Sequence, residues 1–220
     1  STNELNYLGS KLMRAVIGTN NVDNCARVCH SPTALGMQRT FGTGAATNSV
    51  EDLKHTNCIM VIGANPTIGH PVTGAKLKQF AMKTGNVSIV IDPRRTELAR
   101  YATHHISLRP GTNVAVLNMM TFFIIEAGLA DEKFVAERTE GFEDFIEQVK
   151  RIDLDKLEEV SGVDRETVKA AALARICSGP IMGVAAAGDP SWDRALSRSR
   201  SFSHHSGIVR SPSAWGLAQL

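Results

Sequence analysis

Cys25, Cys29 and His30 are the first residues of the chain whose types and spacing suit chemistry. They lie in a polar, turn-rich segment, residues 19–32, which predicts a loop. The neighbouring Arg27 and His30 would favour the thiolate form of Cys29, which binds soft metals and attacks electrophiles. The two cysteines are not spaced as the Cys-x-x-Cys of a zinc ribbon, and no second pair completes one. Cys29 is therefore a candidate metal ligand or nucleophile; the alternative is that both cysteines are ordinary loop residues.

Three further loops follow predicted strands and carry residues that suit a nucleotide. In a doubly wound sheet, ligands bind beyond the carboxyl ends of the strands. The candidate binding residues at these ends are Gly63, Ala64, Asn65 and Pro66, then Asp92, Pro93, Arg94 and Arg95, and finally Gly111, Thr112 and Asn113.

Each loop offers a different kind of contact. The first combines a glycine, which allows close backbone approach, with an amide side chain. In the second, Asp92 can accept hydrogen bonds from ribose or from a guanine edge, and Arg94 and Arg95 can neutralise phosphate. The third opens a helix, whose N-terminus favours an anion. Together the loops predict a nucleotide or dinucleotide-like cofactor, although an Asp-Pro-Arg after a strand also occurs as a plain helix-initiating turn. No NAD-type Gly-x-Gly-x-x-Gly follows a strand, and no Walker loop occurs.

The elements that must position these residues alternate between strands and helices. Continuous apolar runs predict strands over 58–63 and 87–91, with a third over 104–108. This alternation favours right-handed crossovers in a mainly parallel sheet. The expected fold class is therefore α/β, a Rossmann-like, doubly wound sheet with flanking helices. The predicted helices span residues 2–17, 31–42, 71–83, 96–101, 114–126, 131–137, 141–151 and 164–176.

The composition of the chain changes near residue 177. Residues 1–177 carry the periodic elements and are expected to form part of one domain. Residues 178–220 are rich in Ser, Arg and Gly and show no sustained periodicity. This second region is predicted to be disordered or to result from a shift of reading frame.

The overall composition excludes several other classes of protein. The chain has 220 residues, of which 43% are hydrophobic and 21% charged, with a formal net charge of +2. This balance gives no reason to expect nucleic acid or a membrane surface as a partner. The apolar runs are shorter than the ~20 residues of a membrane span. Four cysteines do not make a dense disulfide framework, so a reduced, cytosolic setting is expected, with Cys58 a buried strand residue.

The segment over residues 14–30 resembles molybdopterin-dependent formate dehydrogenases. The likeness is carried by Gly18-Thr19-Asn20-Asn21-Val22-Asp23 and by Cys25-Ala26-Arg27-Val28-Cys29-His30. It continues through the three strand-end loops to Glu137-Arg138-Thr139-Glu140-Gly141. In all it covers about residues 1–176, so residues 1–177 are expected to be a partial molybdopterin oxidoreductase domain.

This resemblance implies a catalytic site built on Cys29 and His30. In the family the position matching Cys29 is a cysteine or selenocysteine bound to molybdenum or tungsten, and a histidine follows it. The three loops are expected to hold a bis-molybdopterin guanine dinucleotide cofactor, with Cys25 beside it but not a metal ligand. The implied reaction is the oxidation of formate to carbon dioxide, in which His30 accepts or relays the proton.

Other parts of the family pattern are missing from the sequence. The family's 4Fe-4S segment precedes the matching region, and its substrate-orienting arginine follows it. The chain is therefore expected to be a fragment of a catalytic alpha subunit and inactive alone. Its parent would pass electrons to electron-transfer subunits or to an NAD-linked, ferredoxin or hydrogenase-type acceptor. The expected location is the cytoplasm, with the periplasm as the alternative because the parent's N-terminus is absent.

Two rival hypotheses stay open. The first is a nitrate reductase-like enzyme of the same superfamily, which would also bind its metal through cysteine. A histidine does not characteristically follow the cysteine in that group, so His30 favours formate. The second is a non-catalytic nucleotide-binding module in which Cys29 is a plain loop residue, and it predicts nucleotide affinity without dependence on a metal.

Overall fold

The chain folds around one parallel sheet. The computed structural model describes residues 2–44, 49–174, 181–185 and 216–219. Its five strands are parallel and pair in the order β3-β2-β1-β4-β5. The chain adds strands on one side of β1 and then on the other, as in doubly wound sheets. The predicted α/β fold class is thus confirmed. The strands are β1 (Cys58–Ile62), β2 (Val87–Ile91), β3 (His104–Ile106), β4 (Ile181–Ala185) and β5 (Gly216–Gln219).

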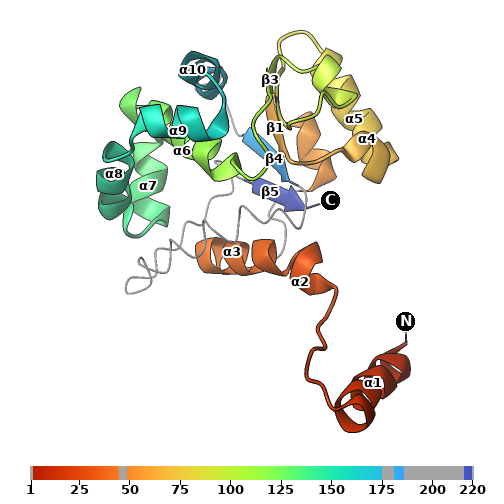
Figure 1. The fold of residues 1–220 in the computed structure, drawn as a ribbon. Coiled ribbons are helices and arrows are strands. Elements are labelled where there is room, and N and C mark those ends of the chain that lie inside the picture. The colour runs from red at the N-terminus through yellow and green to blue at the C-terminus, as the bar shows by residue number, and fades with distance from the viewer. Residues whose placement is uncertain (1, 45–48, 175–180, 186–215, 220) are drawn as a thin grey trace.

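Helices precede the sheet and cover both of its faces (Figure 1). The helices before β1 are α1 (Asn3–Lys11), the π-helix η1 (Leu12–Ile17), α2 (Ala26–Cys29), α3 (Ser31–Phe41) and the 3-10 helix η2 (Val50–Lys54). Those between the strands are α4 (Pro66–Gly69), α5 (Pro71–Met82) and the 3-10 helix η3 (Leu98–Arg100). Those after β3 are α6 (Asn113–Glu126), α7 (Glu132–Arg138), α8 (Phe142–Lys150), α9 (Leu154–Ser161) and α10 (Arg165–Leu173).

The two faces of the sheet form two hydrophobic cores because successive strand residues point to opposite sides. Met60 and Ile62 of β1 belong to the core that α6 and α10 complete. Ile59 and Val61 belong to the opposite core, with Leu77 of α5. Every residue of β1 and β2 is buried, as expected for parallel strands covered on both faces. The strand interior is therefore structural, and polar chemistry is confined to the strand ends.

The N-terminal helix lies apart from this body. Figure 1 shows α1 projecting away from the sheet and from its covering helices. The helix predicted over 2–17 is present, and Gly18 ends it with φ 78°. Its apolar residues nevertheless remain exposed, including Leu8, Leu12 and Val16. Of the helices in the described ranges, none is both long and apolar enough to cross a membrane.

Most predicted elements are present, with several differences. The segment predicted as a loop over 19–32 contains the one-turn helix α2, and α4 follows the first strand-end loop directly. Helix α9 was not predicted at all. Residues 181–185 and 216–219, in the region predicted to be disordered, are strands at one side of the sheet. The rest of residues 178–220 lies outside the described ranges, and the domain boundary at 177 stays a prediction.

Candidate functional site

The structure brings the first two strand-end loops to one edge of the sheet. The strands are parallel and in register, with Ile62 opposite Ile91 and Ile91 opposite Ile106. The backbone N–H of Gly63 donates to the Ile91 carbonyl at 2.8 Å, and that of Asp92 donates to the Ile106 carbonyl at 3.2 Å. Both loops therefore leave the sheet at the same level, at the edge where ligands bind in this architecture.

The first loop, residues 63–66, is shaped by a glycine and a proline. Gly63 has φ 59°, a left-handed conformation that favours glycine, and Pro66 is the buried first residue of α4. Between them, the Asn65 side-chain oxygen accepts a hydrogen bond from the Thr67 hydroxyl at 2.8 Å. Gly63, Ala64 and Asn65 are half-buried, so this loop presents backbone and one oriented amide at the sheet edge.

The second loop, residues 92–95, holds a buried carboxylate. Asp92 is 2% exposed, and its Oδ1 accepts from the backbone N–H of Arg94 at 2.8 Å and more weakly from its Nε at 3.4 Å. Pro93, Arg94 and Arg95 are exposed, so the two guanidinium groups face outward. The loop is tied to the strand beside it, because His105 Nε2 lies 3.1 Å from the Asp92 carbonyl oxygen. A fixed carboxylate beside two exposed cations suits a ligand with both hydrogen-bond donors and phosphate.

The third loop, residues 111–113, opens α6. Gly111 has φ 83°, and the Thr112 hydroxyl donates to the Arg109 carbonyl at 2.6 Å. Thr112 consequently does not cap the helix with its side chain. The loop ends at Asn113, which is buried at the first position of α6. An uncapped N-terminus on a 14-residue helix is a favourable place for an anion.

Helix α9 supports this third loop from outside. The Arg109 guanidinium donates to the Glu159 carbonyl at 2.6 Å, and the Arg109 backbone N–H donates to the Ser161 carbonyl at 2.9 Å. Gly162 ends α9 with φ 68° and lies so close that an added Cβ would come within 2.9 Å of Arg109 Nε. Arg109 and Gly162 were not predicted as site residues. Asp153 before an apolar Leu154 and Leu157, with Gly162 after them, is the capping pattern that would have indicated α9.

Cys29 ends the short helix α2, and both it and Cys25 are exposed. The hydrogen bonds of Cys29 and His30 in the described chain remain local: the backbone N–H of Cys29 donates to the Cys25 carbonyl at 3.0 Å, and the backbone N–H of Ala34 to the His30 carbonyl at 2.9 Å. Arg27 Nε lies 2.7 Å from Asp23 Oδ2, a pair that lowers the pKa of the Asp23 carboxyl. The charge expected to favour the Cys29 thiolate is thus shared with Asp23.

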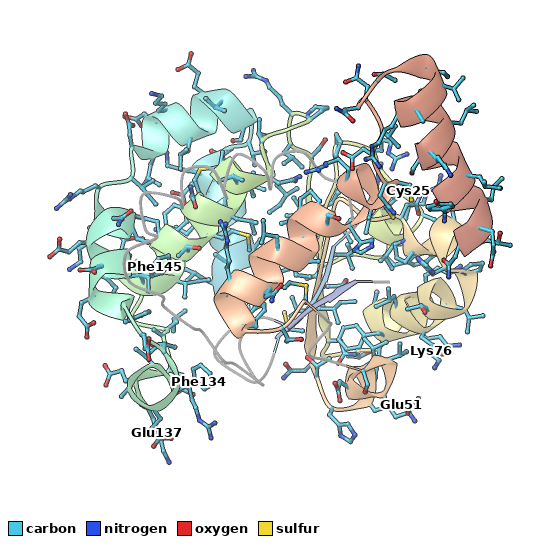
Figure 2. The ribbon with its side chains drawn as sticks, turned by 90° about the horizontal axis from the view of Figure 1, so that it is seen from below. Cys25, Glu51, Lys76, Phe134, Glu137 and Phe145 are labelled. Carbon is cyan, nitrogen blue, oxygen red and sulfur yellow. The ribbon has the colours of Figure 1, made fainter. Side chains whose placement is uncertain are left out.

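Helices α2 and α3 lie across one end of the sheet. In Figure 1 the arrowheads of β4 and β5 point toward the side on which α2 and α3 are drawn, and Figure 2 shows α3 in front of the sheet when seen from that side. The Cys29 segment and the strand-end loops therefore belong to the same end of the molecule. No hydrogen bond joins Cys29 or His30 to those loops within the described ranges.

Cys29 can supply one ligand to a metal whose other ligands belong to a cofactor. Among the described residues, no three His, Cys, Asp or Glu side chains gather into a possible metal site. One exposed thiolate cannot complete the coordination of a transition metal, so most of the ligands would have to come from a cofactor. Cys58 is not an alternative ligand, because burial raises the pKa of its thiol to about 11.

A buried orphan hydroxyl next to Cys29 supports the same fit. Thr33, in the first turn of α3, is 5% exposed, and its Oγ1 has no hydrogen-bond partner among the described residues. With the fixed Asp92 carboxylate and the open N-terminus of α6, the residues at this end of the sheet offer contacts for a large polar cofactor.

Comparison with known proteins identifies the class. The model of the molybdopterin oxidoreductase family matches residues 1–197, and the chain belongs to that family. Its similar relatives include several formate dehydrogenases. The chain is 43% identical over 170 residues to formate dehydrogenase H of Escherichia coli, covering 77% of this chain and 24% of that protein. It is 41% identical over 171 residues to a formate dehydrogenase alpha subunit of Methanococcus maripaludis, covering 78% of this chain and 25% of that one.

A solved structure shares the fold. Acetylene hydratase from Pelobacter acetylenicus matches 93% of this chain and 28% of its own, with a TM-score of 0.59 and 27% sequence identity. The chain thus spans about a quarter of the length of the proteins that it resembles. The name of this structure describes a different reaction from that of the sequence relatives, so the shared fold does not by itself define the substrate.

Proposed function

We propose that this chain is part of the catalytic subunit of a molybdopterin-dependent formate dehydrogenase. The observation that carries the proposal is the Cys29-His30 pair in a chain that is more than 40% identical to formate dehydrogenase subunits. Cys29 supplies one thiolate to molybdenum or tungsten. A nitrate reductase-like enzyme is the rival within the family, and the histidine directly after the cysteine favours formate.

The three strand-end loops hold the cofactor, a bis-molybdopterin guanine dinucleotide, through its nucleotide arms. Asp92 accepts hydrogen bonds from a ribose or a guanine edge, which its nearly complete burial and fixed orientation favour. Arg94 and Arg95 are exposed and meet phosphate at the surface, Arg94 by giving up its long contact of 3.4 Å with Asp92. The N-terminus of α6, after Gly111 and Thr112, adds a positive end of a helix dipole.

The reaction converts formate to carbon dioxide, one proton and two electrons. The bound cofactor supplies the two-electron redox chemistry. The residues of this chain bind and orient that cofactor, and the Cys29 thiolate tunes it. His30, exposed beside Cys29, accepts the proton and passes it toward solvent. A 4Fe-4S cluster outside these residues would pass the two electrons to a further subunit or acceptor.

Metal and pterin content of the intact gene product, with formate-driven dye reduction, tests this proposal. We expect molybdenum or tungsten, pterin and formate oxidation in the wild type. Cys29→Ala should abolish formate oxidation, whereas Cys25→Ala, at the other end of the same short helix, should keep most of it. Equal activity of the two variants would contradict the role of Cys29.

The same preparation separates the rival hypotheses. Reduction of nitrate without formate oxidation would favour the nitrate reductase-like enzyme. Protein that lacks pterin and metal when made in a host that synthesises the cofactor, yet binds guanine nucleotides, would favour the nucleotide-binding module. Retention of pterin with turnover of acetylene alone would assign the chain to the reaction named for its structural neighbour.

A further inference from the structure

Thr33 is an unusual threonine for a helix. Other threonine hydroxyls in or next to helices are paired. Thr40, Thr121 and Thr139 donate to the carbonyl four residues earlier, at 2.8, 2.8 and 2.7 Å. Thr67 and Thr167, in the first turns of α4 and α10, donate to the side-chain oxygens of Asn65 at 2.8 Å and Asp164 at 3.2 Å. The corresponding acceptor for Thr33 is the carbonyl of Cys29, and that bond is not made. Thr33 Oγ1 is buried and has no hydrogen-bond partner in the part of the chain that the structure describes. Leaving a buried hydroxyl unpaired is unfavourable, so it needs an explanation.

The irregular backbone at His30, between α2 and α3, explains why the Thr33 hydroxyl does not donate to the Cys29 carbonyl. His30 has φ −151° and ψ −9°, which separates α2 from α3 and turns the Cys29 carbonyl out of the α3 hydrogen-bond pattern. His30 also provides no side-chain cap for α3. The first backbone N–H groups of α3 have no acceptor within the helix, and they lie beside this hydroxyl. In a helix, side chains lean toward the N-terminus, so the Thr33 hydroxyl is directed to the same place.

Thr33 lies on the side of α3 that faces the rest of the molecule. It is buried together with Met37, one turn further along, whereas most other residues of α3 are exposed or half-buried. Figures 1 and 2 place α3 across the end of the sheet at which the strand-end loops emerge. The orphan hydroxyl is thus close in the chain to Cys29 and on the inward side of its helix.

We propose that the first turn of α3 is a cofactor contact in which the Thr33 hydroxyl donates a hydrogen bond to an acceptor group of the molybdopterin bound at Cys29. This inference rests on the proposed function and adds a binding residue to it. A hydroxyl and the positive end of a helix dipole both favour a negatively charged acceptor. Thr33 then contributes to holding the cofactor rather than to the stability of the empty protein.

Two substitutions at Thr33 and one matched control test this role. Thr33→Val keeps the shape and removes the hydroxyl, Thr33→Ser keeps the hydroxyl, and Thr40→Val removes a hydroxyl from the opposite end of the same helix. The intact gene product is prepared with cofactor and, from a cofactor-deficient host, without it. Two quantities are measured. The first is the rate of pterin release, which pterin fluorescence monitors, and the second is the unfolding temperature of the cofactor-free protein.

We expect Thr33→Val to release pterin about five- to tenfold faster than the wild type, because it loses one hydrogen bond to the cofactor. Its cofactor-free form should unfold at the same temperature as the wild type or at a higher one. Thr33→Ser should release pterin at nearly the wild-type rate, and so should Thr40→Val. Wild-type release from Thr33→Val would overturn the inference, as would a lower unfolding temperature that accounts for its faster release. A wild type without pterin would instead remove the proposed function, and this inference with it.

Discussion

At the scale of single residues, the environments of the cysteines decide which of them can do chemistry. Cys25 and Cys29 are exposed on α2, where solvent or a cofactor can reach their sulfur atoms. Cys58 is fully buried in the central strand, and burial raises the pKa of its thiol to about 11. A buried thiol in apolar surroundings is chemically inert because its thiolate form is disfavoured. The same residue type is thus part of the buried core in β1 and accessible to solvent on α2.

This difference predicts a pattern of thiol modification. In the folded, cofactor-free protein at pH 7.5, an alkylating reagent should modify the exposed Cys25 and Cys29 within minutes. Cys58 should be modified only after unfolding. Peptide mapping by mass spectrometry measures each site separately, and in the cofactor-loaded protein Cys29 should become protected while Cys25 stays reactive. Modification of Cys58 at the rate of Cys25 would show that the sheet is not formed as described.

At the scale of elements, α9 is a support for the loop that opens α6. Arg109 is bonded through its backbone and its side chain to two carbonyls at the end of α9, Glu159 and Ser161. Gly162 allows this close approach because it has no Cβ and adopts φ 68°. The helices after β3 therefore do more than cover the sheet, since they fix where the third candidate cofactor loop lies.

Substitution of Gly162 should disturb this support in a measurable way. We expect Gly128→Ala, at φ 63° with no atom near its Cβ, to cost roughly 1–2 kcal/mol from backbone strain alone. Gly162→Ala should cost about 1 kcal/mol more, because its Cβ displaces Arg109. Urea unfolding gives both values, and in an Arg109→Met background the extra cost at Gly162 should disappear. Equal costs for the two glycines in the wild-type background would contradict the contact.

At the scale of the whole molecule, one parallel sheet has a buried, apolar interior, and polar candidate residues lie beyond one end of its strands. The strands β1 and β2 contribute almost only apolar side chains, and the candidate site residues come from loops and helix ends. Around this body lie exposed acidic residues with lowered pKa values, among them Glu97, whose carboxylate accepts from Lys78 Nζ at 2.8 Å. His104, half-buried in β3, has a pKa lowered by burial.

These shifts predict that the folded protein loses stability in acid. Glu97, Asp23, Glu51 and Glu4 have folded-state pKa values below their ordinary 3.8 (Asp) and 4.5 (Glu), so the unfolded chain binds protons first as the pH falls. His104 acts in the same direction below its ordinary 6.5. The stability that these groups add is complete at neutral pH and is lost as the pH falls through their folded-state values. Urea midpoints at pH 7, 5 and 3.5 measure it.

A variant and a salt series separate the contribution of Glu97. Glu97→Gln should flatten the decline between pH 5 and 3.5 but leave the curve near neutral pH parallel to that of the wild type. Because the pair with Lys78 is exposed, 1 M salt should reduce its effect. An acid decline that is unchanged in Glu97→Gln would mean that the pair contributes nothing to the pH dependence.

Local sequence determined where most of the strands and helices begin and end. Apolar runs predicted β1 and β2 to the residue or nearly so, because a strand buried on both faces must be continuously apolar. Helix ends followed from capping residues such as Asp164, whose side chain accepts from the Thr167 backbone N–H, and Gly42 with φ 74°. The strand-end positions of Gly63 and Asp92 were equally predictable, since they depend only on where each strand ends.

Only the tertiary structure decided which of these residues meet, and the reason is that the decisive contacts join distant parts of the chain. Arg109 bonds to Glu159, fifty residues away, through a helix that the sequence pattern did not single out. The burial of Asp92 depends on its neighbours in the folded sheet, and the unpaired hydroxyl of Thr33 depends on a single backbone break at His30. Propensities and capping rules act over a few residues, whereas packing against other elements sets these features.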